Sequence, residues 1–166
     1  AVNSGTVLIY GRVDGVWIQE AMVTAPDAGW DHQFGEGLSI SGNTVVVGAA
    51  EAFDATGRAY VYHREDGVWS LQAQLLASDV SAGNQFGGRV SIDGDNLLIA
   101  AHGHDSDGVL DSGAAYLYKR SGSTWTLIEK FSAPDGEKWD RYGRSISISG
   151  NHMAIGAPWD DDKGDE

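Results

Sequence analysis

Residues 34–76 read FGEGLSISGNTVVVGAAEAFDATGRAYVYHREDGVWSLQAQLL, and this stretch decides the fold. It opens with an alternating run, a two-residue Gly-Asn turn and a β-branched run, which is the pattern of a β-hairpin. After a loop, Tyr60 and Tyr62 lie two residues apart on one face of a second alternating segment, which turns at Asp66 and Gly67. The stretch therefore predicts four antiparallel strands in succession.

The same pattern occurs three times along the chain. Trp17, Trp69 and Trp125 are separated by 52 and then 56 residues, and an aromatic-glycine pair follows each tryptophan with the same spacing. These pairs are Phe34-Gly35, Phe86-Gly87 and Tyr142-Gly143. An internal period of this size, filled with strand-like sequence, indicates a repeat protein. We expect one repeat array over residues 1–166, with repeats near 5–57, 58–112 and 113–166.

The repeats predict an all-β protein built from four-stranded antiparallel blades. No segment has a sustained helical period, and the 23 glycines favour strands joined by tight turns. If a blade runs from the aromatic-glycine pair to the strand after the tryptophan, residues 34–78 and 86–133 are whole blades. Residues 5–25 and 142–157 are then half-blades. Because open sheet edges invite pairing, we expect further propeller blades of the same parent chain, or a second copy, to complete them.

Three segments carry a family resemblance: FGGRVSIDGDNLLIAA (86–101), SGAAYLYKRSGSTWTLIEKFSAPDG (112–136) and YGRSISISGNHMAIGAP (142–158). They resemble the FG-GAP repeat of bacterial proteins, which is related to the repeats of integrin α-subunit β-propellers. The resemblance implies a β-propeller, as a rule seven-bladed, that serves in binding or cell adhesion and is secreted or on the cell surface. The alternative is a β-trefoil, which also has three repeats of four strands but in which the FG and GAP places have no role.

Calcium is expected away from its usual place in such repeats. The resemblance implies calcium in the first hairpin of each repeat, but the turns there read SGN, DGDN and SGN and are too short and too poor in carboxylates. A better candidate is HDSDGVLD, where Asp105, Asp107 and Asp111 surround Gly108. This loop predicts a weak calcium site, and the alternative is a solvated acidic loop.

Negative charge collects at one end of the predicted blades, which we call the loop face. In a four-stranded meander, the loop between strands two and three and the loop to the next blade emerge at the same end. These loops are residues 26–33, 50–57, 78–85, 102–112, 134–141 and 158–166, and they hold 16 of the 24 acidic residues but 3 of the 11 basic ones. The loop face also holds the three tryptophans outside the periodic place.

Those three tryptophans and the acids beside them are the predicted ligand-binding residues. Binding residues collect on loops held by a rigid scaffold, and exposed aromatic rings flanked by acids stack on sugars. The candidates are Trp30, Asp31, Trp139, Asp140, Trp159 and Asp160. The alternative for the tryptophans is a local plug between adjacent loops. Trp17, Trp69 and Trp125 are instead expected to pack in the core between sheets.

Composition excludes several classes of protein. A net charge of −13 repels phosphate backbones, so we expect no nucleic-acid partner. No apolar run reaches the roughly 18–20 residues of a membrane span, so we expect no membrane insertion. There is no cysteine nucleophile, no G-x-S-x-G elbow and no HExxH motif, which argues against an enzyme.

The sequence thus predicts an extracellular, non-catalytic binding or adhesion propeller that contacts a protein or a glycan through its loop face. One alternative is a purely structural spacer or assembly module. Another is the non-catalytic propeller of a larger secreted enzyme.

Overall fold

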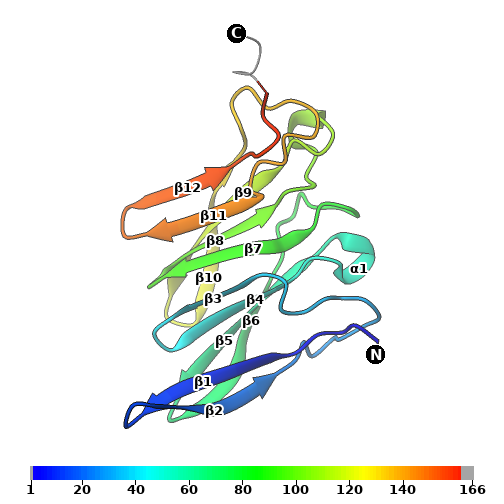
Figure 1. The fold of residues 1–166 in the computed structure, drawn as a ribbon. Coiled ribbons are helices and arrows are strands. Elements are labelled where there is room, and N and C mark those ends of the chain that lie inside the picture. Colours follow the sequence, from blue (N-terminus) through cyan, green and yellow to red (C-terminus); the bar gives the residue numbers. More distant parts are fainter. Residues whose placement is uncertain (1, 162–166) are drawn as a thin grey trace.

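The computed structural model describes residues 2–161 as a row of twisted antiparallel sheets (Figure 1). Two short helical turns, α1 (Ala52–Ala55) and η1 (Ser106–Gly108), lie in loops. The strands are β1 (Val7–Val13), β2 (Val16–Val23), β3 (Leu38–Ser41), β4 (Thr44–Ala49), β5 (Arg58–Glu65), β6 (Val68–Leu75), β7 (Phe86–Asp93), β8 (Asn96–Ala101), β9 (Ala114–Ser121), β10 (Thr124–Phe131), β11 (Ser145–Ser149) and β12 (His152–Gly156).

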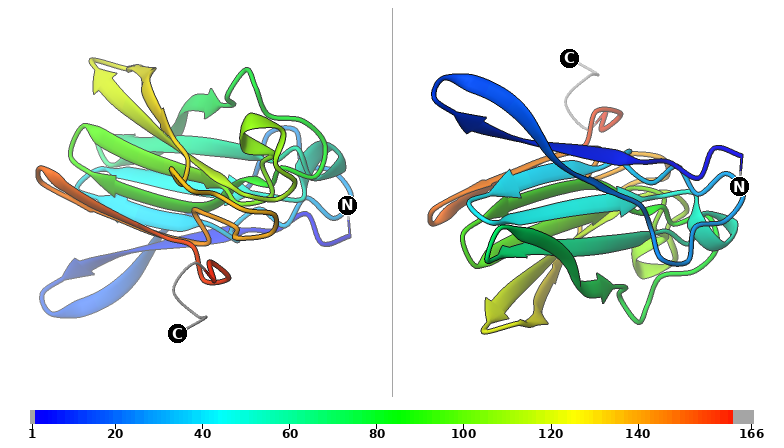
Figure 2. Two further views of the ribbon diagram at one scale, coloured as in Figure 1. Left: turned by 90° about the horizontal axis from the view of Figure 1, so that it is seen from above. Right: turned by 90° about the horizontal axis from the view of Figure 1, so that it is seen from below.

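The strands form two four-stranded sheets between two hairpins. The sheets have the orders β3-β4-β5-β6 and β7-β8-β9-β10, and the hairpins β1-β2 and β11-β12 lie at opposite ends of the row. Seen along the row, successive sheets overlap (Figure 2). This arrangement confirms the predicted fold class, two whole blades and two half-blades of a propeller, and not the β-trefoil.

The core lies between successive sheets, and β4 shows why its sequence is apolar throughout. Side chains alternate between the two faces of a strand. Val45 and Val47 accordingly pack with β1 and Phe34 on one side, whereas Val46 packs with β7 and β8 on the other. A strand buried on both faces reads as a continuous apolar run.

Hydrogen bonds between neighbouring blades explain the serines in the first strands of the two whole blades, β3 and β7. The Ile92 N–H donates to Ser39 Oγ across the blade boundary at 3.1 Å. One blade later, the Ile148 N–H donates to Ser91 Oγ at 3.1 Å. Ser39, Ser41 and Ser91 thus each accept a backbone hydrogen bond from the next blade.

The prediction that the repeat tryptophans pack in the core is confirmed for Trp125, which is 8% exposed. Trp69 is partly buried against the core. The prediction is wrong for Trp17, which is 66% exposed. Trp69 Nε1 donates to Glu20 in the preceding hairpin at 3.1 Å, and Trp125 Nε1 donates to Gln72 in the preceding blade at 3.0 Å. Trp17 lies in the first hairpin of the described residues, and no preceding blade among these residues covers it.

Candidate functional site

Backbone hydrogen bonds tie the two kinds of long loop together on the loop face. The Gly83 N–H donates to Asp54 O and the Phe86 N–H to Thr56 O, both at 3.0 Å. The same pairing recurs in the next repeat, where the Trp139 N–H donates to Leu110 O at 3.0 Å. The loops lie at one end of the sheets, on the right of Figure 1, and the hairpin turns lie at the other.

Two of the predicted tryptophans share one hollow on this face. Trp139 and Trp159 line a cavity of about 450 Å³ together with Lys138, Arg141 and Asp161. The rings are 54% and 53% exposed. We call this the tryptophan cavity, and its volume lies in the range of small-ligand sites.

Cations lie against both rings of the tryptophan cavity. Lys138 Nζ lies 4.2 Å from the ring centroid of Trp139, and the guanidinium carbon of Arg141 lies 5.3 Å from that of Trp159. Both distances are typical of cation–π contacts. Lys138 and Arg141 are not among the residues predicted from the sequence, because the net charge of these loops is negative and gives no indication of a basic site.

Trp139 also has an unusual backbone conformation. Its φ is +75°, and the matching positions of the earlier repeats hold Asp31 at +59° and Gly83 at +86°. A bulky residue with positive φ is uncommon and costs about 1–2 kcal/mol. A strained and exposed aromatic residue is a reason to look for function at that position.

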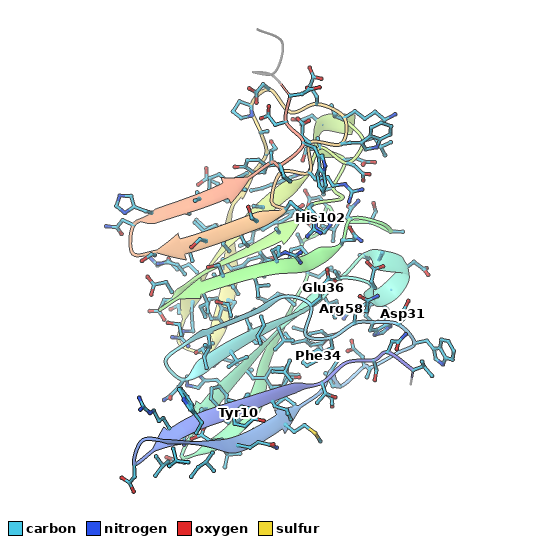
Figure 3. The ribbon with its side chains drawn as sticks, viewed as in Figure 1. Tyr10, Asp31, Phe34, Glu36, Arg58 and His102 are labelled. Atoms are coloured by element: carbon cyan, nitrogen blue, oxygen red, sulfur yellow. The ribbon has the colours of Figure 1, made fainter. Side chains whose placement is uncertain are left out.

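The structure places Trp30 and Asp31 apart from the tryptophan cavity. Trp30 is 76% exposed, in the loop between the first hairpin and the first whole blade. The Asp31 carboxylate accepts a hydrogen bond from Asn3 Nδ2 at 3.3 Å; Figure 3 labels this aspartate. Of the remaining predicted residues, Asp160 is exposed beside Trp159. Residues 162–166, which hold further predicted acids of the loop face, lie outside the described residues.

Asp140 has a role inside its own loop. It is 5% exposed, and its carboxylate accepts the Glu137 N–H at 2.6 Å. The matching residues Asn84 and His32 accept a backbone N–H three residues upstream in the same way. This placement does not support the prediction that Asp140 contacts a ligand, because its carboxylate closes the loop instead.

The three aspartates of the predicted calcium loop do not point at a common centre. Asp105 Oδ1 accepts the Asp111 N–H at 2.9 Å, and Asp111 Oδ2 lies 3.9 Å from Arg141 Nη2. Asp107 is exposed in η1. Among residues 2–161, no group of three His, Cys, Asp or Glu side chains is placed to hold a metal ion. Calcium binding would require Asp105 and Asp111 to exchange these contacts for the ion.

Weak calcium binding therefore stays a prediction, with a direct test. For a dissociation constant of about 10⁻³ M, 10 mM calcium stabilises the fold by about 1.4 kcal/mol, or a few degrees in melting temperature. Thermal unfolding should show this shift in the wild type and in Asp66→Ala, which lies in a turn at the far end. The same shift in Asp107→Ala, or none in the wild type, would contradict the prediction.

His104 belongs to a polar network that joins consecutive blades. It is 6% exposed, and its Nε2 lies 3.2 Å from Asp79 O. The Asp79 carboxylate accepts hydrogen bonds from Tyr116 OH at 3.1 Å and Lys130 Nζ at 2.7 Å. Burial and the charge of Lys130 lower the pKa of His104. The imidazole is thus neutral at pH 7 and forms part of the blade interface.

Comparison with known families agrees with this fold. The FG-GAP repeat model matches residues 17–62, 69–118 and 125–166. The protein is therefore a repeat-built β-propeller chain. It belongs to the FG-GAP repeat family, which confirms the resemblance found in the sequence. No curated protein matches the chain. Among the described residues, no helix has the length and apolarity to cross a membrane.

Proposed function

We propose that this chain is a non-catalytic binding or adhesion module of a secreted or cell-surface protein, and that it contacts a protein or a glycan through the tryptophan cavity. FG-GAP repeats are compatible with a β-propeller that serves in binding or adhesion. They also occur in extracellular or surface proteins. Rigid blades that hold long loops at one end are a common scaffold for binding sites.

The observation that carries the proposal is the exposure of Trp139 and Trp159 in one hollow. A large aromatic ring left half in water contributes little to folding, whereas it buries extensive apolar area when a partner covers it. Aromatic residues are accordingly enriched among the residues that dominate binding energy. A sugar ring or an apolar side chain of a protein fits such a hollow.

The test is an array of glycans and extracellular proteins, probed with the wild type and with the double variant Trp139→Ala/Trp159→Ala. We expect the double variant to lose at least about tenfold in affinity, because a dominant aromatic contact contributes about 2 kcal/mol or more. Its stability should change little. Trp17→Ala is the matched control, since it removes an exposed tryptophan from β2. Equal binding by the double variant and the wild type would refute the proposed site.

A second candidate, a structural or assembly module, is favoured by the first hairpin. Leu8 and Tyr10 of β1 and Leu38 and Ile40 of β3 line a hollow of about 260 Å³ (Tyr10 is labelled in Figure 3). All four side chains are between 45% and 57% exposed. An apolar sheet surface of this kind fits another blade. As a pure spacer, the chain would bind nothing on the array.

A further inference from the structure

Within residues 2–161, a buried histidine directly after β8 has a ring nitrogen without a hydrogen-bond partner. His102 is 4% exposed, and its Nδ1 forms no hydrogen bond within the described residues (Figure 3). The matching residues in the other repeats are Ala50 and Pro158. Gly88 leaves room for the ring, since a Cβ there would lie 3.1 Å from His102 Cε1. This repeat thus has a specific histidine where the other repeats have small apolar residues.

The charges of three nearby arginines act on His102. Burial, and then the charges of Arg144, Arg141 and Arg89, lower the pKa of His102 to about 4. The imidazole is therefore neutral at pH 7, and the positive charge of the cluster comes from the guanidinium groups.

These arginines have few anionic partners. Arg89 Nη1 lies 3.5 Å from Glu36 Oε1, and Arg141 Nη2 lies 3.9 Å from Asp111 Oδ2. Within residues 2–161, the half-buried side chain of Arg144 forms no hydrogen bond and no ion pair. A guanidinium presents several N–H donors in a plane that suits a carboxylate. The cluster can therefore accept one more anionic group.

The arginine cluster adjoins the tryptophan cavity. Arg141 belongs to both, because it lines the cavity and acts on the pKa of His102. The Arg144 N–H donates to Arg141 O at 3.0 Å. A ligand whose ring lies against Trp159 would thus have an attached acidic group close to Arg141, and the Arg144 main chain adjoins that residue.

We propose that the loop face binds a uronic-acid-containing oligosaccharide, whose sugar ring stacks in the tryptophan cavity and whose carboxylate is held by Arg141 and Arg144. The inference rests on the proposed function and specifies its ligand. An acidic sugar combines a flat C–H face with a carboxylate on the same ring, and the paired tryptophan and arginine side chains match both parts.

The net charge of −13 does not prevent a carboxylate from binding to arginine side chains that it contacts directly. Charges in solution are screened over about 8 Å at physiological ionic strength. The distant acids of the loop face slow the approach of an anion, whereas the arginines act on it directly. Asp161 is the one acidic residue that lines the cavity among the described residues.

The test is calorimetric titration of the whole chain with the tetrasaccharides of galacturonate, mannuronate and hyaluronan. The one that binds most tightly is then compared with its methyl ester, which keeps the sugar chain and removes the charge. We expect the ester to bind about tenfold more weakly or worse, because hydrogen bonds to charged groups contribute about 1.5–3 kcal/mol. Arg144→Gln and Arg141→Gln should each weaken binding of the acid and leave the ester unaffected.

Arg12→Gln, in β1 near the far-end turn, is the matched control and should bind like the wild type. Thermal unfolding verifies that each variant is folded. Equal affinity for acid and ester, or wild-type affinity in both arginine variants, overturns the inference. The inference is also overturned if none of the three tetrasaccharides binds, while a neutral glycan, an acidic peptide or a protein binds in a way that depends on Trp139. In that case the proposed function still stands. Binding of no ligand at all on the array or in the titrations overturns both.

Discussion

Trp125→Ala should lower the free energy of unfolding by about 3–5 kcal/mol, the usual cost of truncating a buried tryptophan. The ring is 8% exposed and belongs to the core between the two whole blades. Its Nε1 donates to Gln72 in the preceding blade at 3.0 Å, and the guanidinium carbon of Arg120 lies 5.4 Å from the ring centroid. The substitution therefore removes packing, a hydrogen bond and a cation–π contact. Urea denaturation measures the loss.

Trp17→Ala is the matched control, because Trp17 has the same place in its repeat but is 66% exposed. Surface substitutions usually change stability by less than about 0.5 kcal/mol. Similar losses for both variants would mean that burial between blades does not decide the role of the repeat tryptophans.

Gly57→Ala should destabilise the fold by about 2–5 kcal/mol. Gly57 has a φ of +83° and forms a parallel bridge with Phe86, and a Cβ there would overlap the Phe86 backbone. A side chain with positive φ costs about 1–2 kcal/mol, and overpacking adds about 1–3 kcal/mol. The same bridge joins Gly5 to Phe34 and Gly113 to Tyr142. This contact therefore belongs to the construction of every repeat.

Gly67→Ala separates the two contributions. Gly67 has nearly the same φ, +82°, but a Cβ there would have no neighbour within 4 Å. Only the conformational cost of about 1–2 kcal/mol should remain. If Gly57→Ala lost no more stability than Gly67→Ala, the close approach of the two backbones would not be a constraint on the fold.

The fold could be predicted from the sequence because each repeat contains local signals for its strands and turns. The alternation in LSIS, the Gly-Asn turn and the apolar run TVVVGA each specify one part of a blade. The exposure of Trp17 could not be predicted from such local signals. Burial of that side chain depends on a neighbouring blade, and sequence periodicity assigns the same role to all three tryptophans.

The candidate site could be predicted from the sequence only in part. The loop positions of Trp139 and Trp159 indicated a shared face, but not that their rings would lie in one cavity with Lys138 and Arg141. Side-chain direction in an irregular loop depends on φ and on contacts between loops. Neither can be predicted from local sequence patterns. For Asp140 a signal was present, since His32 and Asn84 offer an acceptor at the same place in the earlier repeats. An acceptor side chain that recurs at one position of the repeat for the same hydrogen bond indicates a structural role.

The most direct test of the proposed binding site uses the indole N–H signals of the six tryptophans in a ¹⁵N-labelled sample. Each tryptophan gives one signal, and single substitutions assign them. The chain is titrated with the ligand that binds most tightly on the array. We predict that the signals of Trp139 and Trp159 shift together and saturably, while those of Trp17 and Trp125 stay in place. Saturable shifts at Trp17 or Trp30, with Trp139 and Trp159 unchanged, would contradict the account and place the binding surface elsewhere.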